Sequence, residues 1–308
     1  MQVSVVVCTH AEDRYEHFVA AAESVLSQTY DPVELILVVD GNETVFERVQ
    51  ADFGDRKMVC VHHNETNRGV SASRTTGAEL ATGEVVAFID DDAVAEPDWI
   101  EELVAAYEST DALAVGGRMN GDWLAGRPWF LPPEFDWLVG VTYPGFAEPG
   151  EEVRNTFESN LSFRREVFLD LGGFDPDLGP TATDYSHSEG AELGTRLRAE
   201  YGRGVVYAPD AVVRHKVFEY RTTLRWLLSR AFEQGTSKRS LERRTAASTS
   251  EEFGYLRTLL FVHVPRRLWA LVRAPSGAAL SQFLMLFVFT GVVGLGYLSA
   301  VAGGALRR

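Results

Sequence analysis

The 308-residue sequence contains few lysines and few cysteines. Lysine occurs only at Lys57, Lys216 and Lys238, and 29 basic against 44 acidic side chains leave a net charge of −15. Such a surface repels nucleic acid, whose phosphates are bound by clustered Lys and Arg, so we expect no nucleic-acid partner. The two cysteines, Cys8 and Cys60, lie in apolar runs, which favours two buried thiols over a disulfide.

Low salt is expected to unfold this protein. Acidic, lysine-poor surfaces are typical of proteins from a very salty cytoplasm, where counter-ions screen the mutual repulsion of carboxylates. The screening length is about 10 Å at 0.1 M salt and about 3 Å at 1 M, so the repulsion grows as salt is withdrawn. We predict that the thermal unfolding midpoint, followed by circular dichroism, falls as potassium chloride is lowered through this range. An unchanged midpoint would contradict a halophilic origin.

The end of the chain lacks acidic side chains and then lacks charge altogether. No Asp or Glu follows Glu252, and no charged residue occurs from Ala274 to Leu306. The run exceeds the roughly 20 apolar residues that cross a bilayer, which predicts a transmembrane segment over 276–303 rather than a buried core helix. One crossing is expected, and the glycines in the run leave a re-entrant tail as the alternative.

The stretch 241–275 is interpreted as an amphipathic juxtamembrane linker with its arginines toward lipid headgroups, because aromatic and aliphatic side chains alternate there with arginine. Four arginines precede the apolar run and two follow it, namely Arg257, Arg266, Arg267 and Arg273, then Arg307 and Arg308. By the positive-inside rule, the preceding part of the chain, a domain predicted over 1–240, faces the cytoplasm from the cell membrane.

Short apolar, β-branched runs alternate with helix-like stretches as far as Met119. The runs are Val3–Thr9, Glu34–Asp40, Met58–His62, Glu84–Asp90 and Ala112–Met119. The stretches between them are Arg14–Ser27, Val45–Asp52, Ser71–Ala81 and Asp98–Tyr107. This alternation predicts an α/β domain with a mostly parallel sheet flanked by helices. Ligands of such sheets bind beyond the carboxyl ends of the strands, which is where polar residues end several of these runs.

Two later segments are less regular. The proline-rich, aromatic Asp122–Phe146 is predicted as a loop, either a lid facing the acceptor or plain packing of its tryptophans. A strand over Gly204–Ala208 is expected to end at Pro209 and to resume as Ala211–His215.

Three adjacent carboxylates, Asp90, Asp91 and Asp92, follow the fourth apolar run. Their mutual repulsion makes burial costly unless a cation such as Mg²⁺ or Mn²⁺ is bound, and a solvated acidic turn is the alternative. A phosphatase of the haloacid-dehalogenase type also carries such a motif. It places the motif on its first strand and needs a downstream lysine, and here only Lys216 and Lys238 follow, which disfavours it.

In order and spacing, these features resemble the family 2 glycosyltransferases with a GT-A fold, over Gln2 to Lys238. The segments that carry the resemblance are VSVVVCTH, LILVVDGN, NRGVSASRTTGAELATGEVVAFIDDDA, SNLSFRREVFLDLGGFDPDL, SEGAELGTRL and PDAVVRHKV. The resemblance implies an enzyme that transfers a sugar from a nucleotide-sugar donor with inversion, using a divalent metal. Transfer of a single sugar is expected, because the Q-x-x-R-W motif of processive synthases is reduced to Arg225-Trp226.

The same resemblance implies roles for individual donor-binding residues. Thr9 would begin the nucleotide pocket, Asp40 would hydrogen-bond a uracil base, and Arg74 would lie against the base or the diphosphate. Asn160 and Arg164 would frame the sugar.

The metal and the diphosphate have their own implied residues. Asp92 would be a direct ligand of Mn²⁺ or Mg²⁺, Asp90 would approach the ribose or the metal, and His215 would reach the diphosphate or the metal. A packed histidine is the alternative at position 215.

The catalytic base is where the sequence departs from the family pattern. The family has an acidic pair whose second member is the base, and here Glu189 holds the first position and Gly190 the second. We assign the base to Glu189, with Asp184 and Glu192 as the alternatives.

Acidic composition with a C-terminal apolar run resembles the transferases that build the dolichol-phosphate-linked glycan of archaeal S-layer glycoproteins. That resemblance implies a hexuronic acid donor such as UDP-glucuronic acid, a glycosylated dolichyl phosphate acceptor, and other glycan-assembly transferases as partners. Two alternatives stay open: transfer to dolichyl phosphate itself, and a non-catalytic scaffold that binds nucleotide sugar, since Gly190 replaces the expected base.

Overall fold

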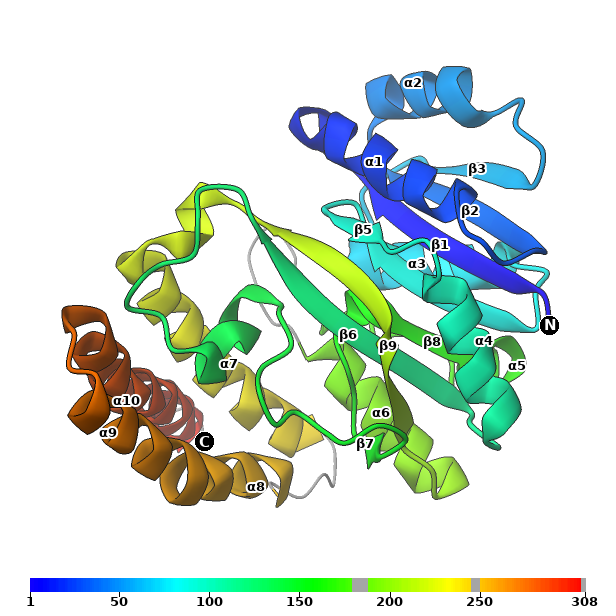
Figure 1. Ribbon diagram of the computed structural model, residues 1–308. Coiled ribbons are helices and arrows are strands. Elements are labelled where there is room, and N and C mark those ends of the chain that lie inside the picture. The colour runs from blue at the N-terminus through cyan, green and yellow to red at the C-terminus, as the bar shows by residue number, and fades with distance from the viewer. Residues whose placement is uncertain (179–187, 245–249, 306–308) are drawn as a thin grey trace. The chain divides into compact units, whose positions relative to one another are not determined.

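The computed structural model describes residues 1–178, 188–244 and 250–305. The chain divides into two compact units. The first unit comprises Met1–Asn120 and Ala147–Lys216, and the second comprises Gly121–Phe146 and Val217–Arg308. Figure 1 labels the α-helices and strands of both units.

The first unit contains a nine-stranded sheet flanked by helices. Its strands are β1 (Val3–Thr9), β2 (Val33–Asp40), β3 (Val59–Asn64), β4 (Val85–Asp90), β5 (Ala93–Ala95), β6 (Ala114–Trp123), β7 (Glu152–Val153), β8 (Leu161–Arg164) and β9 (Val205–Val217). Its helices are η1 (Glu12–Arg14), α1 (Tyr15–Leu26), α2 (Glu43–Phe53), α3 (Val70–Leu80), α4 (Trp99–Ser109), η3 (Glu158–Asn160), α5 (Arg165–Asp170) and α6 (Glu189–Tyr201). The last residues of β6 and β9 belong to the second unit.

The strands are ordered β3-β2-β1-β4-β8-β6-β9-β5, with β7 paired to β9. β1 pairs in parallel with β2 and β4, and β2 pairs in parallel with β3. β8 runs antiparallel between β4 and β6, and β5 and β7 are antiparallel to β9. The predicted α/β architecture is therefore confirmed, as a mixed sheet with a parallel N-terminal half.

Alternate residues of the parallel strands face two separate cores. Val5 packs with residues of α1, α2 and α4 on one face of the sheet, whereas Val6 packs with α3, α5 and α6 on the other. Neighbouring residues of a strand point to opposite faces, so a strand covered on both sides must be apolar throughout. This is why the first, second and fourth strands were recognisable as continuous apolar runs.

Strand β9 corrects the prediction of two strands separated by Pro209. The strand is continuous from Val205 to Val217, with β7 paired at 205–206 and β5 paired at 213–215. Pro209 lies between these two partners, so the amide that proline lacks is not needed by either of them.

The second unit is mainly helical. Its elements are η2 (Pro133–Val139), η4 (Glu219–Thr222), α7 (Leu224–Arg244), α8 (Ser250–Thr258), the π-helical turn η5 (Leu259–His263), α9 (Val264–Arg273) and α10 (Gly277–Ala305). η2 corrects the prediction that Asp122–Phe146 is entirely loop. Prolines begin this 3₁₀ helix, and Phe135 and Leu138 anchor it in an apolar cluster with Leu227 of α7 and Phe289 of α10.

A buried ion pair links η2 to α9. The Glu134 carboxylate accepts two hydrogen bonds from the Arg267 guanidinium, both at 2.9 Å, and Arg267 also donates to Gln282 of α10 at 2.8 Å. Glu134 is 4% exposed. Arg267 is therefore directed at protein groups, in contrast to the expectation that the arginines of this stretch all face lipid headgroups.

Among the described residues, only α10 has the length and composition of a membrane-crossing helix. Its apolar window covers Gly277–Gly303 with a mean hydropathy of 2.1, and 17% of the window is buried. Exposed apolar side chains continue onto α9, where Trp269 and Val272 are more than half exposed.

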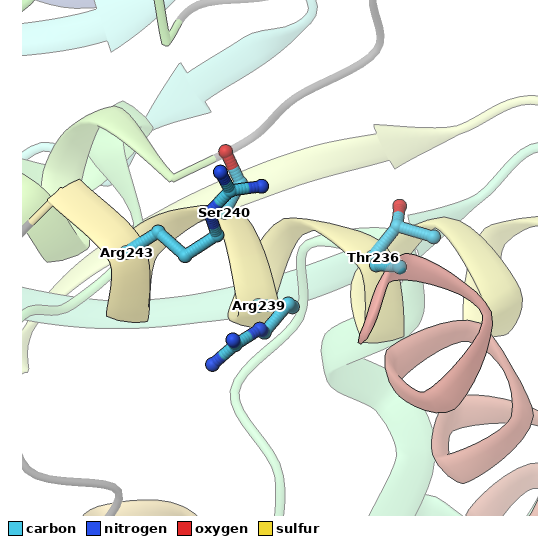
Figure 2. A pocket seen from close by; sticks show the side chains of 5 residues that line it. Thr236, Arg239, Ser240 and Arg243 are labelled. Atoms are coloured by element: carbon cyan, nitrogen blue, oxygen red, sulfur yellow. The ribbon is translucent and has the colours of Figure 1, made fainter. Parts of the chain in front are cut away.

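Helices α7 and α10 pack closely, and a pocket lies beside their contact. Figure 2 shows the α7 side chains that line it, Thr236, Arg239, Ser240 and Arg243, and Ala300 of α10 completes the lining. The four α7 residues are spaced three and four apart, which places them on one face of the helix. Arg239 lies 2.5 Å from Glu242, and the Tyr297 hydroxyl donates to Glu242 at 2.8 Å.

Replacing Gly296 with alanine is expected to destabilise the second unit by about 1–3 kcal/mol, because the new methyl group overlaps the backbone of α7. A Cβ at Gly296 would lie 2.0 Å from the carbonyl oxygen of Phe232. Gly294→Ala is the matched control, because a Cβ there meets nothing within 4 Å. Denaturant unfolding of both variants in detergent measures the difference, and equal free energies of unfolding would contradict this close contact.

Candidate active site

Three polar residues end three neighbouring parallel strands of the first unit. Thr9 is the last residue of β1, Asp40 of β2 and Asp90 of β4. Because β1 lies between β2 and β4, all three side chains reach the same edge of the sheet. This edge is where the sequence predicted a ligand-binding site, beyond the carboxyl ends of the strands.

Asp40 orders the segment that leads into α3. Its carboxylate accepts hydrogen bonds from the Asn64 amide at 2.9 Å and from the backbone amides of Arg68 and Gly69 at 3.0 and 2.8 Å. Gly69 has a φ of +86° and immediately precedes α3. If the Asp40 carboxylate also accepts a hydrogen bond from a uracil base, as the resemblance implies, it must do so in addition to these three groups.

Thr9 and Arg14 contact the acidic cluster that follows β4. The Thr9 hydroxyl donates to Asp91 at 3.0 Å, and the Arg14 guanidinium lies 3.8 Å from both Asp91 and Asp92. Burial, and then the neighbouring Asp92 carboxylate, raise the pKa of Asp91 to about 7. The raised pKa shows that this carboxylate is crowded and desolvated, as is expected at a site that attracts a cation.

His215 is brought to Asp92 by strand pairing. β5 follows the acidic cluster directly and pairs with β9, with Ala93 opposite His215. Nε2 of His215 lies 3.4 Å from the Asp92 carboxylate, and the Lys216 amide donates to the Asp92 carbonyl at 2.9 Å. The two predicted metal ligands are thus adjacent although 123 positions separate them in the sequence.

Asp92 and His215 fit a hard divalent cation by the chemistry of their donor atoms, since carboxylate oxygen and imidazole nitrogen both bind Mn²⁺. Within residues 1–178, 188–244 and 250–305, no group of three or more His, Cys, Asp or Glu side chains is arranged to hold a metal. A cation held here would therefore need further ligands, such as oxygens of the diphosphate and water.

Arg74 of α3 lies among carboxylates. It forms an ion pair with Asp90, and its other terminal nitrogen lies 3.5 Å from Glu189. Burial alone would lower the pKa of Arg74, but Asp90, Glu189 and Glu158 together raise it. Arg74 is 5% exposed and lies over the Phe174 ring, so it is a fixed buried cation at the centre of the site.

Glu158 and Glu189 lie close together beside Arg74. Glu158 belongs to η3 and accepts a hydrogen bond from the Gly190 amide at 3.0 Å. Burial, and then the charge of Glu158, raise the pKa of Glu189 to about 8, and burial also raises the pKa of Glu158. The pair therefore holds a proton more readily than isolated carboxyl groups do.

Asn160 and Arg164, which the resemblance places around the sugar, lie at different places relative to the sheet. The Asn160 amide is fully buried, accepts from the Trp99 indole and donates to two backbone carbonyls, so it fixes η3 from within the core. Arg164 pairs in register with Val85, at the start of β4, whereas Leu161 pairs near its end. β8 is antiparallel to β4, so Arg164 lies at the opposite edge of the sheet from Asp90.

Glu192 and Asp184 were the alternative candidates for the catalytic base. Glu192 forms an ion pair with Arg196 one turn along α6, at 2.6 Å, and is thus committed to a structural contact. Asp184 lies outside the described residues. Glu189 remains beside Arg74 and Glu158.

Two residues of the site were not identified from the sequence, Glu158 and Arg14. Glu158 directly precedes the segment SNLSFRREVF that carries the resemblance, which is the one local signal for it. Arg14 ends η1, and nothing in its sequence context pointed to the acidic cluster.

Comparison with known proteins supports an assignment to a family. A model described as glycosyl transferase family 2 matches residues 4–172. The chain is 52% identical over 298 residues to the glucosyl-dolichyl phosphate glucuronosyltransferase of Haloferax volcanii, covering 96% of this chain and 95% of that protein. It is 29% identical over 178 residues to the succinoglycan biosynthesis protein ExoM of Rhizobium meliloti, covering 57% and 52% of the two chains.

Solved structures share the fold. The mannosyltransferase PcManGT from Pyrobaculum calidifontis, in complex with GDP-Man and Mn²⁺, has a TM-score of 0.56 and 19% identity, covering 99% of this chain and 86% of that one. TarS 1-349 of S. aureus, in complex with UDP-GlcNAc, has a TM-score of 0.54 and 16% identity, covering 95% and 82%. The resemblance noted in the sequence is therefore confirmed: the chain belongs to the family 2 glycosyltransferases and has a GT-A-like fold.

Proposed function

We propose that this protein transfers glucuronic acid from UDP-glucuronic acid to glucosyl-dolichyl phosphate, as a step of protein N-glycosylation that serves S-layer glycoproteins. The observation that carries the proposal is the 52% identity, over nearly the whole of both chains, to the Haloferax volcanii enzyme of that name. The acidic, lysine-poor composition supports a similar saline source.

The side chains at the edge of the sheet support an inverting mechanism. A carboxylate would take the proton of the acceptor hydroxyl while that oxygen attacks the anomeric carbon and the nucleoside diphosphate leaves. Asp92 and His215 would hold Mn²⁺ or Mg²⁺, whose charge would stabilise the leaving diphosphate. Arg74 is buried and forms an ion pair with Asp90, which fixes the position of that carboxylate at the end of β4.

We also propose that α10 attaches the protein to the cell membrane, with the first unit on the cytoplasmic side. The length and hydropathy of the helix support attachment, and the excess of arginines before it supports the orientation. Attachment would raise the effective concentration of an acceptor that is itself confined to the membrane. Other transferases of the same glycan would meet the lipid-linked product on the same surface.

The proposal is tested by assaying the purified full chain in detergent, at high salt with Mn²⁺. The donors are UDP-glucuronic acid, UDP-glucose, UDP-GlcNAc and GDP-mannose, and the acceptors are dolichyl phosphate and glucosyl-dolichyl phosphate. We expect transfer only from UDP-glucuronic acid and only to the glucosylated lipid, with the product identified by mass spectrometry.

The other results are equally informative. Transfer to bare dolichyl phosphate would identify an enzyme of the first step in a pathway. Binding of UDP-glucuronic acid without transfer to either lipid would favour a nucleotide-sugar-binding scaffold. A preference for another donor would replace the proposed sugar and leave the acceptor to be decided by the same assay.

A further inference from the structure

Glu158 occupies the space that a side chain at position 190 would fill. A Cβ at Gly190 would lie 2.2 Å from Oε1 of Glu158, 2.9 Å from its carboxyl carbon and 3.1 Å from its Cγ. The Gly190 amide donates to the same Oε1 at 3.0 Å. Glycine at this position thus makes room for a carboxylate that arrives from another element, η3, 32 positions earlier in the chain.

Glu158 is also better placed to meet a substrate than Glu189. Glu189 is only 3% exposed, and its Oε1 lies 3.5 Å from the buried Arg74. Glu158 is half-buried as a residue, and so is less enclosed than Glu189. A group that takes a proton from an incoming hydroxyl must come within hydrogen-bonding distance of it, which favours the more accessible carboxylate.

The position of Glu158 is fixed by the two residues that follow it. The next residue, Ser159, accepts a hydrogen bond from the Asp90 amide at the end of β4, at 2.9 Å. Asn160 anchors the end of η3 through the Trp99 indole at 2.8 Å. The short helix η3 is therefore hydrogen-bonded to the end of β4, the strand that leads into the acidic cluster. Glu158 is held beside the carboxyl ends of the parallel strands.

We propose that Glu158 is the general base of the transfer reaction, taking the place of the acid that is missing at Gly190. This inference rests on the proposed function only in requiring that the chain transfers a sugar to a hydroxyl group. It replaces Glu189, which we assign instead to positioning Arg74.

In the proposed step, Glu158 takes the proton of the acceptor hydroxyl while the sugar changes its bond. The acceptor oxygen forms a bond to the anomeric carbon, and the bond from that carbon to the diphosphate oxygen breaks, with its electron pair leaving on the nucleoside diphosphate. The hydroxyl proton passes to Glu158. Since Oε1 is bound to the Gly190 amide, Oε2 is the atom that accepts it. Release of the proton to water restores the carboxylate.

Glu158→Gln tests the role directly, because it keeps the shape and removes the basic oxygen. We expect kcat for transfer to fall by about 10²–10⁴-fold, the usual contribution of a general base. The dissociation constant of the donor, measured by calorimetry, should stay within a few fold. The assay uses whichever donor and acceptor the unmodified protein turns over, so failure of the proposed sugar or lipid does not affect this test.

Moving the carboxylate from position 158 to position 190 distinguishes a catalytic base from a charge that only supports the structure. Glu158→Ala removes the three atoms that a Cβ at position 190 would meet, so Gly190→Asp can be accommodated in that background. Aspartate also suits the first turn of α6, because a negative charge there interacts favourably with the helix dipole. We expect Glu158→Ala to be inactive, Gly190→Asp alone to be impaired by the clash, and the double variant to recover at least tenfold over Glu158→Ala.

Two results would overturn the proposal. If Glu158→Gln keeps more than a tenth of the activity while Glu189→Gln loses it, the base is Glu189. If the folded double variant binds donor but recovers no activity, Glu158 contributes only charge next to Arg74. Thermal unfolding of each variant shows whether it is folded.

Discussion

Asp92→Asn is expected to lower sugar transfer by about 10³-fold and to weaken Mn²⁺ binding together with it. The substitution keeps the size of the side chain and replaces a charged oxygen by a neutral amide, which is a poorer ligand for a hard cation. Stabilisation of the leaving diphosphate by a bound metal contributes several kcal/mol to such reactions, so loss of the metal ligand that we propose at Asp92 should be among the most damaging single changes.

Binding of Mn²⁺, followed by electron paramagnetic resonance, separates this cause from a general loss of folding. Asp98→Asn is the matched control, because it removes the same charge from an exposed position just before α4. His215→Ala should weaken Mn²⁺ binding less than Asp92→Asn does, since it removes a neutral ligand. If Asp92→Asn binds Mn²⁺ as tightly as the unmodified protein, Asp92 has no place in the metal site.

The parallel half of the sheet was predictable because its physics is local. A strand buried on both faces is apolar throughout, so β1, β2 and β4 differ from the predicted runs by one residue at most. The polar residues Thr9, Asp40 and Asp90 then fall at the ends of those strands. Because parallel neighbours share their carboxyl edge, this part of the site follows from the sequence.

The remainder of the site depends on the direction of strands and on contacts between distant residues. Nothing in the sequence of β8 shows that it runs antiparallel to β4, and that direction moves Arg164 away from the site while bringing Glu158 close to it. The contact between Glu158 and Gly190 cannot be read from the sequence either, because it joins a 3₁₀ turn to a helix that begins about thirty positions later in the chain. The one indication in the sequence was Gly190, which stands where the family pattern has the catalytic base.

In the second unit, too, contacts between distant residues could not be predicted from the sequence. The segment Asp122–Phe146 was predictable as rich in proline and aromatic residues, but its partners are set by tertiary packing. Phe135 packs against Phe289, more than 150 positions away, and Glu134 binds Arg267. An apolar run near the C-terminus predicts a helix; it does not show which segment will cover part of that helix.

Arg74→Met is expected to destabilise the first unit by about 3–5 kcal/mol, the usual result of removing one partner from a buried group of charges. The variant leaves Asp90, Glu158 and Glu189 without their shared cation. The pKa of Glu189, raised to about 8 by burial and by Glu158, lies well above the ordinary carboxyl value, so the folded state binds a proton that the unfolded state has released. Stability therefore falls as pH rises from about 4.5 toward 8.

Removing Arg74 takes away a charge that lowers the pKa of both glutamates, so their pKa values should rise further and the loss of stability should be larger at pH 8 than at pH 6. Denaturant unfolding at these two pH values measures the difference. Arg74→Lys, which keeps the charge, should lose less, and Arg68→Met, on the surface, should change stability by no more than about 0.5 kcal/mol. A loss from Arg74→Met that is the same at both pH values would mean that packing against Phe174, rather than charge, holds Arg74 in the site.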